Sequence, residues 1–186
     1  MKLIGVLLLL LLTACSQVVP VSRYDAYLAP GVGVALPAVQ GENFSHQQRI
    51  TMQRNSRQYQ WLAFLEVDEE ALHLLGLTLT GVRLFEIRYD VLGIHTLYRV
   101  SSSLPESAQI LTDVMIAFWP DSAWTPVLPE GWVLRDSESE RTLLAKNGEP
   151  MILVRYEQTG SGRLPVELLH KGFGYQVVLE KLDEER

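Results

Sequence analysis

Side chains that could do chemistry are scattered along this chain. The four histidines lie in separate segments without the short spacing of paired metal ligands: His46, His73, His95 and His170. His73, on an otherwise apolar stretch, is expected to be a hydrogen-bonded histidine of the core or of a cavity. Ser161 lies between two glycines, which suits a turn better than the nucleophile elbow of a hydrolase. The acidic residues cluster where solvated charge is expected, and no glycine cluster precedes a helix. The sequence therefore predicts no enzyme, no metal site and no cofactor.

The only cysteine, Cys15, stands in the one motif with a clear chemical meaning. Residues 3–12 are apolar apart from Gly5, a run too short to span a bilayer but typical of a signal peptide. The run ends in Leu12-Thr13-Ala14-Cys15, which resembles the bacterial lipobox, where a peptidase cuts before the cysteine that takes the diacylglycerol thioether. The sequence therefore predicts a lipoprotein precursor with a signal peptide at 1–14 and lipid on Cys15.

The residue after the cysteine and the overall charge bear on location and partners. Ser16 follows Cys15 where inner-membrane lipoproteins of enteric type usually carry aspartate, so the resemblance implies sorting to the outer membrane, facing the periplasm. Its partners would then be the membrane, reached through acyl chains, and the lipoprotein-sorting machinery. A net charge of −6 without a basic run argues against nucleic acid as a partner. A single cysteine excludes an internal disulfide.

The rest of the chain divides into a tether and one domain. Residues 15–40 hold several prolines and glycines without a sustained period, and we expect them to form the lipidated tether or a loosely docked arm. Residues 41–186 are expected to form the domain. Alternation and turn residues predict strands, with a turn at Asn55-Ser56 and a hairpin at Asn147-Gly148. These strands are 49–53, 59–67, 71–80, 82–90, 132–135, 141–146, 151–158, 164–169 and 175–180.

One helix interrupts the strands. Residues 103–106 have the pattern of a capping box, and an apolar stripe at helical spacing follows, formed by Leu111, Val114, Met115 and Phe118. Trp119-Pro120 ends the helix. The segment 71–80 is apolar on both faces, as in a strand that is covered on both sides or lines a cavity. This order of elements predicts an antiparallel α+β domain.

Several short motifs carry a family resemblance: the segment 75–85 with Tyr89-Asp90, the segment 110–113 with 118–120, and Gly174-Tyr175. With them the chain resembles small bacterial lipoproteins of unknown function that are often encoded in aryl polyene gene clusters. More broadly it is similar to the LolA/LolB architecture. The resemblance implies a curved antiparallel sheet, an incomplete half-barrel closed by helices over an apolar cavity. Proteins similar to LolB carry an exposed leucine before the glycine of the third-to-fourth strand turn, where this chain has Thr80.

The apolar side chains exceed what one flat sheet face can hide. Packing of the helix on the sheet explains most of these side chains. The alternative is that they line a cavity and bind an apolar ligand through shape and desolvation. The candidates are Trp61, Phe64, Leu75, Leu77, Phe85, Ile87, Met115 and Phe118. The expected function is to bind, or help localise, an acylated lipid or aryl polyene lipid at the periplasmic face. The alternative is a structural or interaction lipoprotein that docks a partner protein. A cavity of several hundred Å³ favours the first, and a filled core the second.

Overall fold

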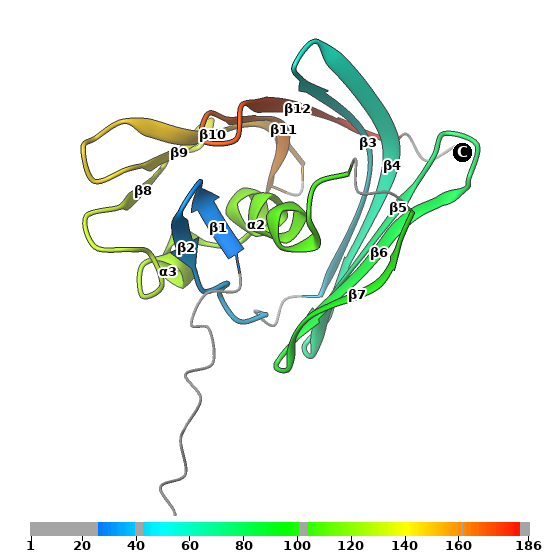
Figure 1. Ribbon diagram of the computed structural model, residues 1–186, viewed down its shortest axis with the longest axis horizontal. Helices are drawn as coiled ribbons and strands as arrows, with labels where there is room; N and C mark the ends of the chain where they lie inside the picture. The colour runs from blue at the N-terminus through cyan, green and yellow to red at the C-terminus, as the bar shows by residue number, and fades with distance from the viewer. Residues whose placement is uncertain (1–25, 40–42, 101–103, 161, 183–186) are drawn as a thin grey trace, which may run out of the picture.

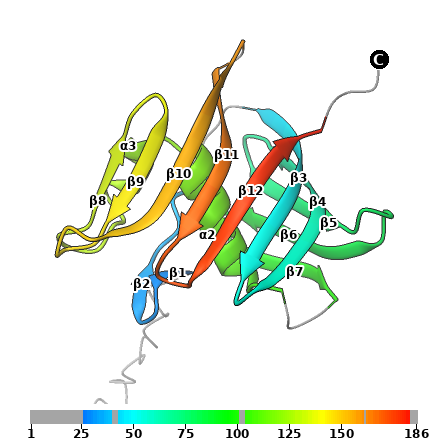
Figure 2. The same ribbon diagram turned by 90° about the horizontal axis from the view of Figure 1, so that it is seen from above.

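The computed structural model describes residues 26–39, 43–100, 104–160 and 162–182 (Figure 1). Within these residues, ten antiparallel strands form one sheet in the order β7-β6-β5-β4-β3-β12-β11-β10-β9-β8. The sheet does not close into a barrel, because β7 and β8 remain its two edges. It curves around helix α2, as Figures 1 and 2 show from two directions. The expected sheet-dominated, antiparallel α+β fold is thus confirmed.

The strands that precede the helices are β1 (Ala26–Ala29), β2 (Val32–Val34), β3 (Phe44–Arg54), β4 (Arg57–Val67), β5 (Ala71–Leu77), β6 (Arg83–Asp90) and β7 (Gly93–Arg99). The helices are α2 (Ser107–Phe118) and α3 (Asp121–Trp124). The strands that follow are β8 (Val133–Asp136), β9 (Glu140–Leu144), β10 (Pro150–Thr159), β11 (Gly162–His170) and β12 (Tyr175–Lys181).

Tight hairpins set the register of the long strands. Asn55 and Ser56 both have positive φ angles, 49° and 61°, as a two-residue turn between β3 and β4 requires. The turn places Ile50 opposite Trp61, and every residue of β3 pairs with one of β4. On its other side β3 pairs with β12, so the last strand in the sequence lies beside one of the first. The predicted turns at Asn55-Ser56 and Asn147-Gly148 are both confirmed.

Helix α2 lies inside the curve of the sheet and buries an apolar stripe. Leu111 and Met115 are fully buried, and Val114 and Phe118 are partly buried. The expected capping box is wrong, because it places the N-cap at residue 103 and the helix begins later. Glu106 is the N-cap, and its side chain makes no capping hydrogen bond. Its carboxylate instead accepts a hydrogen bond from Arg99 at 3.1 Å, so the neighbouring cation competes with the helix terminus. Ser103 lies outside the described residues.

Residues 26–39, which were expected to belong to the tether or loosely docked arm, are part of the folded domain. Ala26, Leu28 and Val34 are fully buried in the core with α2. The Trp119 indole donates to the carbonyl of Ala38, and the Tyr89 hydroxyl donates to that of Leu36. Apolar residues at alternate positions of β1, Ala26 and Leu28, face the core, and Tyr27 between them is exposed. The expected signal peptide, residues 1–14, and Cys15 lie outside the described residues, among which no helix is long and apolar enough to cross a membrane.

Candidate functional site

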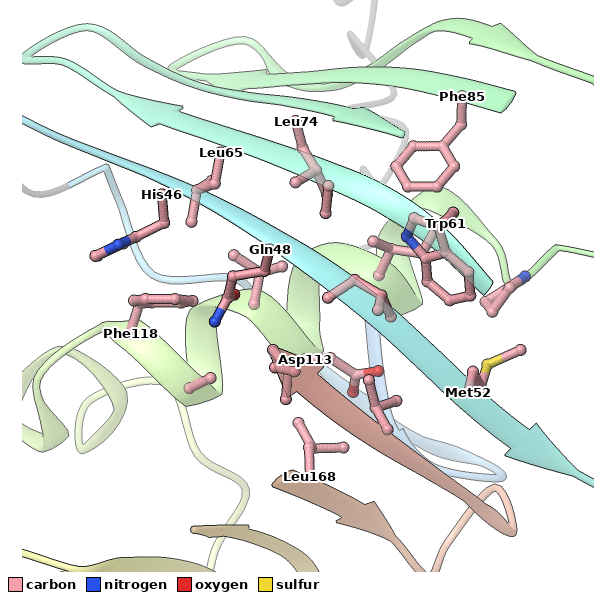
Figure 3. Close-up of a pocket in the computed structure, with 18 of the residues that line it drawn as sticks. His46, Gln48, Met52, Trp61, Leu65, Leu74, Phe85, Asp113, Phe118 and Leu168 are labelled. Atoms are coloured by element: carbon pink, nitrogen blue, oxygen red, sulfur yellow. The ribbon is translucent and has the colours of Figure 1, made fainter. Parts of the chain in front are cut away.

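An apolar cavity of about 90 Å³ lies between α2 and the concave face of the sheet (Figure 3). Alternate residues of the strands point into it, since successive side chains of a strand face opposite sides. The sheet contributes His46, Gln48, Ile50, Met52, Trp61, Ala63, Leu65, Leu74, Phe85, Leu168, Tyr175, Val177 and Leu179. Helix α2 and the segment before it contribute Pro105, Ile110, Asp113, Val114, Ala117 and Phe118.

Two large aromatic side chains form one end of the cavity. The rings of Trp61 and Phe85 meet edge to face, with centroids 6.4 Å apart. Phe85 fits because Gly76, opposite it on β5, has no side chain. A Cβ at Gly76 would lie 2.3 Å from the Phe85 ring, far closer than two carbons approach. The glycine therefore fixes the position of a ring that lines the cavity.

The opposite end of the cavity has a half-buried histidine among aromatic rings. His46 stacks on Phe118, with centroids 5.0 Å apart and an angle of 26° between the planes. Phe44 packs against both. Burial, and then the charge of Lys181, lower the pKa of His46 below its usual value. The imidazole is therefore neutral at neutral pH, which suits an apolar environment.

A carboxyl group from α2 forms the main polar feature of the cavity wall. Asp113 accepts hydrogen bonds from the Tyr175 hydroxyl at 2.5 Å and from the Gln109 amide at 3.2 Å. Burial raises its pKa to about 7, although both hydrogen bonds favour the charged form. Nε2 of the fully buried His170 lies 4.0 Å from the carboxylate and has no hydrogen-bond partner among the described residues. Burial lowers the pKa of His170 to about 4.

The cavity, with its apolar lining, is suited to holding an apolar group. Its volume corresponds to roughly six to nine water molecules, at about 10–15 Å³ of such space for each. This is less than the several hundred Å³ expected for a whole lipid, and is enough for a short acyl segment. No group of three or more metal-ligating side chains gathers within the part of the chain that the structure describes.

The structure separates the eight expected cavity residues into three sets. Trp61, Phe85 and Phe118 line the cavity. Ile87 and Met115 are fully buried in the core, outside the cavity lining. The remaining three, Phe64, Leu75 and Leu77, face the other side of the sheet, and their expected place in the cavity is wrong.

The reason is the register of the β4–β5 hairpin. The Asp68 carboxylate accepts the N–H groups of Glu70 and Ala71 in a tight turn, which places Leu72 opposite Val67. Leu72 and Leu74 therefore share the inner face with Val67 and Trp61, whereas Leu75 pairs with Phe64 on the outer face. Because both faces of β5 are apolar, composition alone could not choose between them. The turn at Asp68 was the signal that could have done so.

Several cavity residues were not predicted, because their strand register, their distance in the sequence or their polar side chain concealed their place. Leu65 lies on the same face of β4 as Trp61, and Leu74 follows from the corrected register. Leu168 and Tyr175 come from β11 and β12, and these strands reach the cavity because β12 pairs with β3, which is distant in the sequence, and β11 pairs with β12. Asp113 lies outside the apolar stripe of the helix, and its hydrogen bond to Tyr175 joins residues that are far apart in the sequence.

The four histidines do not form one site. His73 is half-buried and pairs with Arg88 on the outer face, its Nε2 3.5 Å from the guanidinium, so its expected place in the core or a cavity is wrong. His95 hydrogen-bonds to Asp90 at 3.2 Å. His46 and His170 lie on inner faces of different strands, each with aromatic neighbours.

Comparison with known proteins identifies a family for this chain. No curated protein matches this sequence. A family model described as "Protein of unknown function (DUF3261)" matches residues 45–183, which is most of the chain and runs from β3 to just past β12. The matched region thus holds the ten-stranded sheet apart from its first residue, both helices and the whole cavity lining. The chain belongs to this family of proteins of unknown function.

Proposed function

We propose that this protein binds the apolar part of a lipid or related amphiphile between α2 and the concave face of the sheet. The observation that carries the proposal is the cavity, which is partly open and whose wall is apolar apart from a few polar groups such as Gln48 and Asp113. Sites for apolar ligands usually have this composition, with a few polar groups that fix orientation. Binding would follow from shape and desolvation, with no covalent step.

The proposal includes a location. Cys15 would carry the acyl chains, and Ser16 would direct the protein to the outer membrane, facing the periplasm, through the lipoprotein-sorting machinery. The sheet curved around one helix supports a comparison with the incomplete LolA/LolB-like half-barrel, although the sheet here is open. An acylated lipid or an aryl polyene lipid is the proposed ligand class.

A second candidate function is the docking of a partner protein by a lipoprotein with a nearly filled core. Two observations favour it: the cavity is smaller than a whole lipid, and the outer face carries half-buried Phe64, Leu75 and Leu77. Beyond that outer patch, Leu79 and Val82 are more than half exposed in the β5–β6 turn. Apolar patches on a sheet face often mark interaction surfaces.

Extraction of bound lipid distinguishes the two functions. The full chain with Cys15→Ala would be purified without detergent from its native host, extracted with organic solvent and examined by mass spectrometry. The lipid-binding function predicts a lipid that is retained in stoichiometric amount and lost in Ala63→Phe, which fills the cavity. Ala145→Phe adds the same ring at the β9–β10 turn and should keep the lipid. Absence of lipid from the parent chain, with a partner protein retained, would favour the docking function.

A further inference from the structure

A row of polar side chains continues the inner face of the sheet beyond the cavity. Arg57 on β4 lies directly opposite Arg54 on β3, which lies opposite Tyr175 on β12, which lies opposite His170 on β11. Alternation places Arg54 on the same face as the cavity residue Met52, two positions earlier. The row therefore borders the cavity directly, and Tyr175 belongs to both.

This row forms the floor of an open groove of about 580 Å³ at the end of the sheet where β3 turns into β4. The groove residues include three cations, Arg54, Arg57 and Lys171, and no acidic side chain. The remaining residues of the groove are Gln53, Asn55, Ser56, Gln58, Leu169, His170, Gly174, Tyr175 and Gln176. In a chain of net charge −6, this is a local concentration of positive charge.

The cations of the groove have no ion-pair partner within the described residues, although other arginines of the chain do. Arg54 and Arg57 are moreover directly opposite each other on adjacent strands, an arrangement in which like charges repel. Such a pair is costly by itself and becomes favourable when an anion lies between the two guanidinium groups. Guanidinium groups bind carboxylate and phosphate through paired hydrogen bonds.

We infer that Arg54 and Arg57, with Lys171, bind the anionic head group of an amphiphile whose apolar part enters the α2 cavity. The head group would be a phosphate or a carboxylate. Consecutive inner positions of a strand are roughly 7 Å apart, so a head group at Arg54 and Tyr175 leaves an attached chain at the level of Met52 and Val177. The inference rests on the proposed function and adds the ligand's charge and its orientation.

Calorimetric titration of the full chain carrying Cys15→Ala tests this assignment. The ligands are octyl phosphate, 1-octanol and inorganic phosphate, all below micelle-forming concentrations. Octyl phosphate should bind at least about tenfold more tightly than octanol, as expected for partly exposed charge-assisted hydrogen bonds. Inorganic phosphate should bind at least about tenfold more weakly than octyl phosphate, because it lacks the chain.

The double variant Arg54→Gln, Arg57→Gln should lose the preference for octyl phosphate and keep the affinity for octanol. A matched control, Arg49→Gln with Arg135→Gln, changes the net charge equally at exposed positions away from the groove and should keep the preference. An unchanged octyl phosphate affinity in the double variant would overturn the head-group assignment and leave the proposed function intact. Equal affinity for inorganic and octyl phosphate would overturn the link to the cavity. If neither octyl ligand binds the parent chain, the proposed function fails as well.

Discussion

Asp113 and His170 have opposite effects on stability over the same range of pH. Burial raises the pKa of Asp113 to about 7 from 3.8, so the folded state holds a proton there that the unfolded state has lost. The stabilising contribution of Asp113 therefore falls as the pH rises from about 4 to 7. Burial lowers the pKa of His170 to about 4 from 6.5, and its effect is the reverse, a loss of stability as the pH falls over that range.

Replacing Asp113 by asparagine should remove one of these two effects. The side-chain amide of Asp113→Asn stays neutral at every pH and could still accept from Tyr175, so the variant should gain stability relative to the parent as the pH rises from about 4.5 to 7.5. Urea unfolding at the two pH values measures this difference. A variant whose relative stability falls as the pH rises would show that the carboxylate is the favoured form in the folded protein.

Phe118 tests whether the stripe of α2 faces a cavity or a filled core. Phe118 is partly buried and lines the cavity, so the packing around it is incomplete. Phe118→Ala should therefore cost about 1–2 kcal/mol of unfolding free energy, below the roughly 3–5 kcal/mol of aromatic truncations in filled cores. It should also weaken binding of a fluorescent fatty-acid probe. A loss near the upper figure, with no probe binding by the parent chain, would contradict the cavity assignment.

At the scale of elements, strong local patterns predicted the structure well, and positions set by register or distant packing were missed. The strands of the second half and helix α2 follow clear alternation or a helical stripe and are confirmed. Strand β7 was missed because it is an edge strand of mixed, half-exposed residues. The β1–β2 hairpin was missed because its prolines and glycines suggested a tether. Its burial depends on the contacts of Leu28 and Val34 with the distant core.

The end of α2 is fixed by a buried arginine that no local sequence pattern singles out. Arg141 on β9 donates to the carbonyls of Ile116 and Trp119 and to the carboxylate of Asp136, at 2.7, 2.5 and 2.5 Å. Arg163 also pairs with Asp136. Burial alone would raise the pKa of Asp136, but the two guanidinium groups lower it to about 2. The network thus connects the helix to the β8–β9 edge of the sheet.

Asp136→Asn should destabilise this connection. The substitution removes the counter-charge of Arg141, whose side chain is only 2% exposed. The expected loss is about 3 kcal/mol, at the lower end for a broken buried pair because two carbonyls remain as partners. Glu138→Gln, at an exposed position nearby, serves as the control and should change the unfolding free energy by less than about 0.5 kcal/mol. Equal stability of the two variants in urea would contradict the role of the network.

At the scale of the whole molecule, the open sheet, the cavity and the cationic groove form one continuous inner face. β3 lies at the centre of this face, between β4 and β12, and contributes both Met52 to the cavity and Arg54 to the groove. The sequence predicted the fold class and the apolar excess. It could not predict this face, because the face depends on the pairing of β12 with β3 and on the curvature of the sheet around α2.

The proposed anchor predicts where the whole molecule is found in the cell. Cys15→Ala should remove the acyl chains and release the protein from the outer membrane, because one acylated terminus is its proposed attachment. Cell fractionation and immunoblotting measure this distribution. Ser16→Asp, which keeps the lipid, should move the protein towards the inner membrane in an enteric host. Tight outer-membrane retention of the Cys15→Ala protein after signal cleavage elsewhere would contradict the proposed anchor.

Quenching of Trp61 by a brominated fatty acid shows whether an acyl chain enters the cavity, because Trp61 lies in the cavity wall. The full chain with Cys15→Ala would be titrated with dodecanoic acid brominated at mid-chain. Lipid binding in the cavity predicts quenching that saturates at one acid per chain, and loss of most of this saturable quenching in Trp61→Phe. Absence of saturable quenching in the parent chain, or equal quenching in Trp61→Phe, would show that the acyl chain does not enter the cavity.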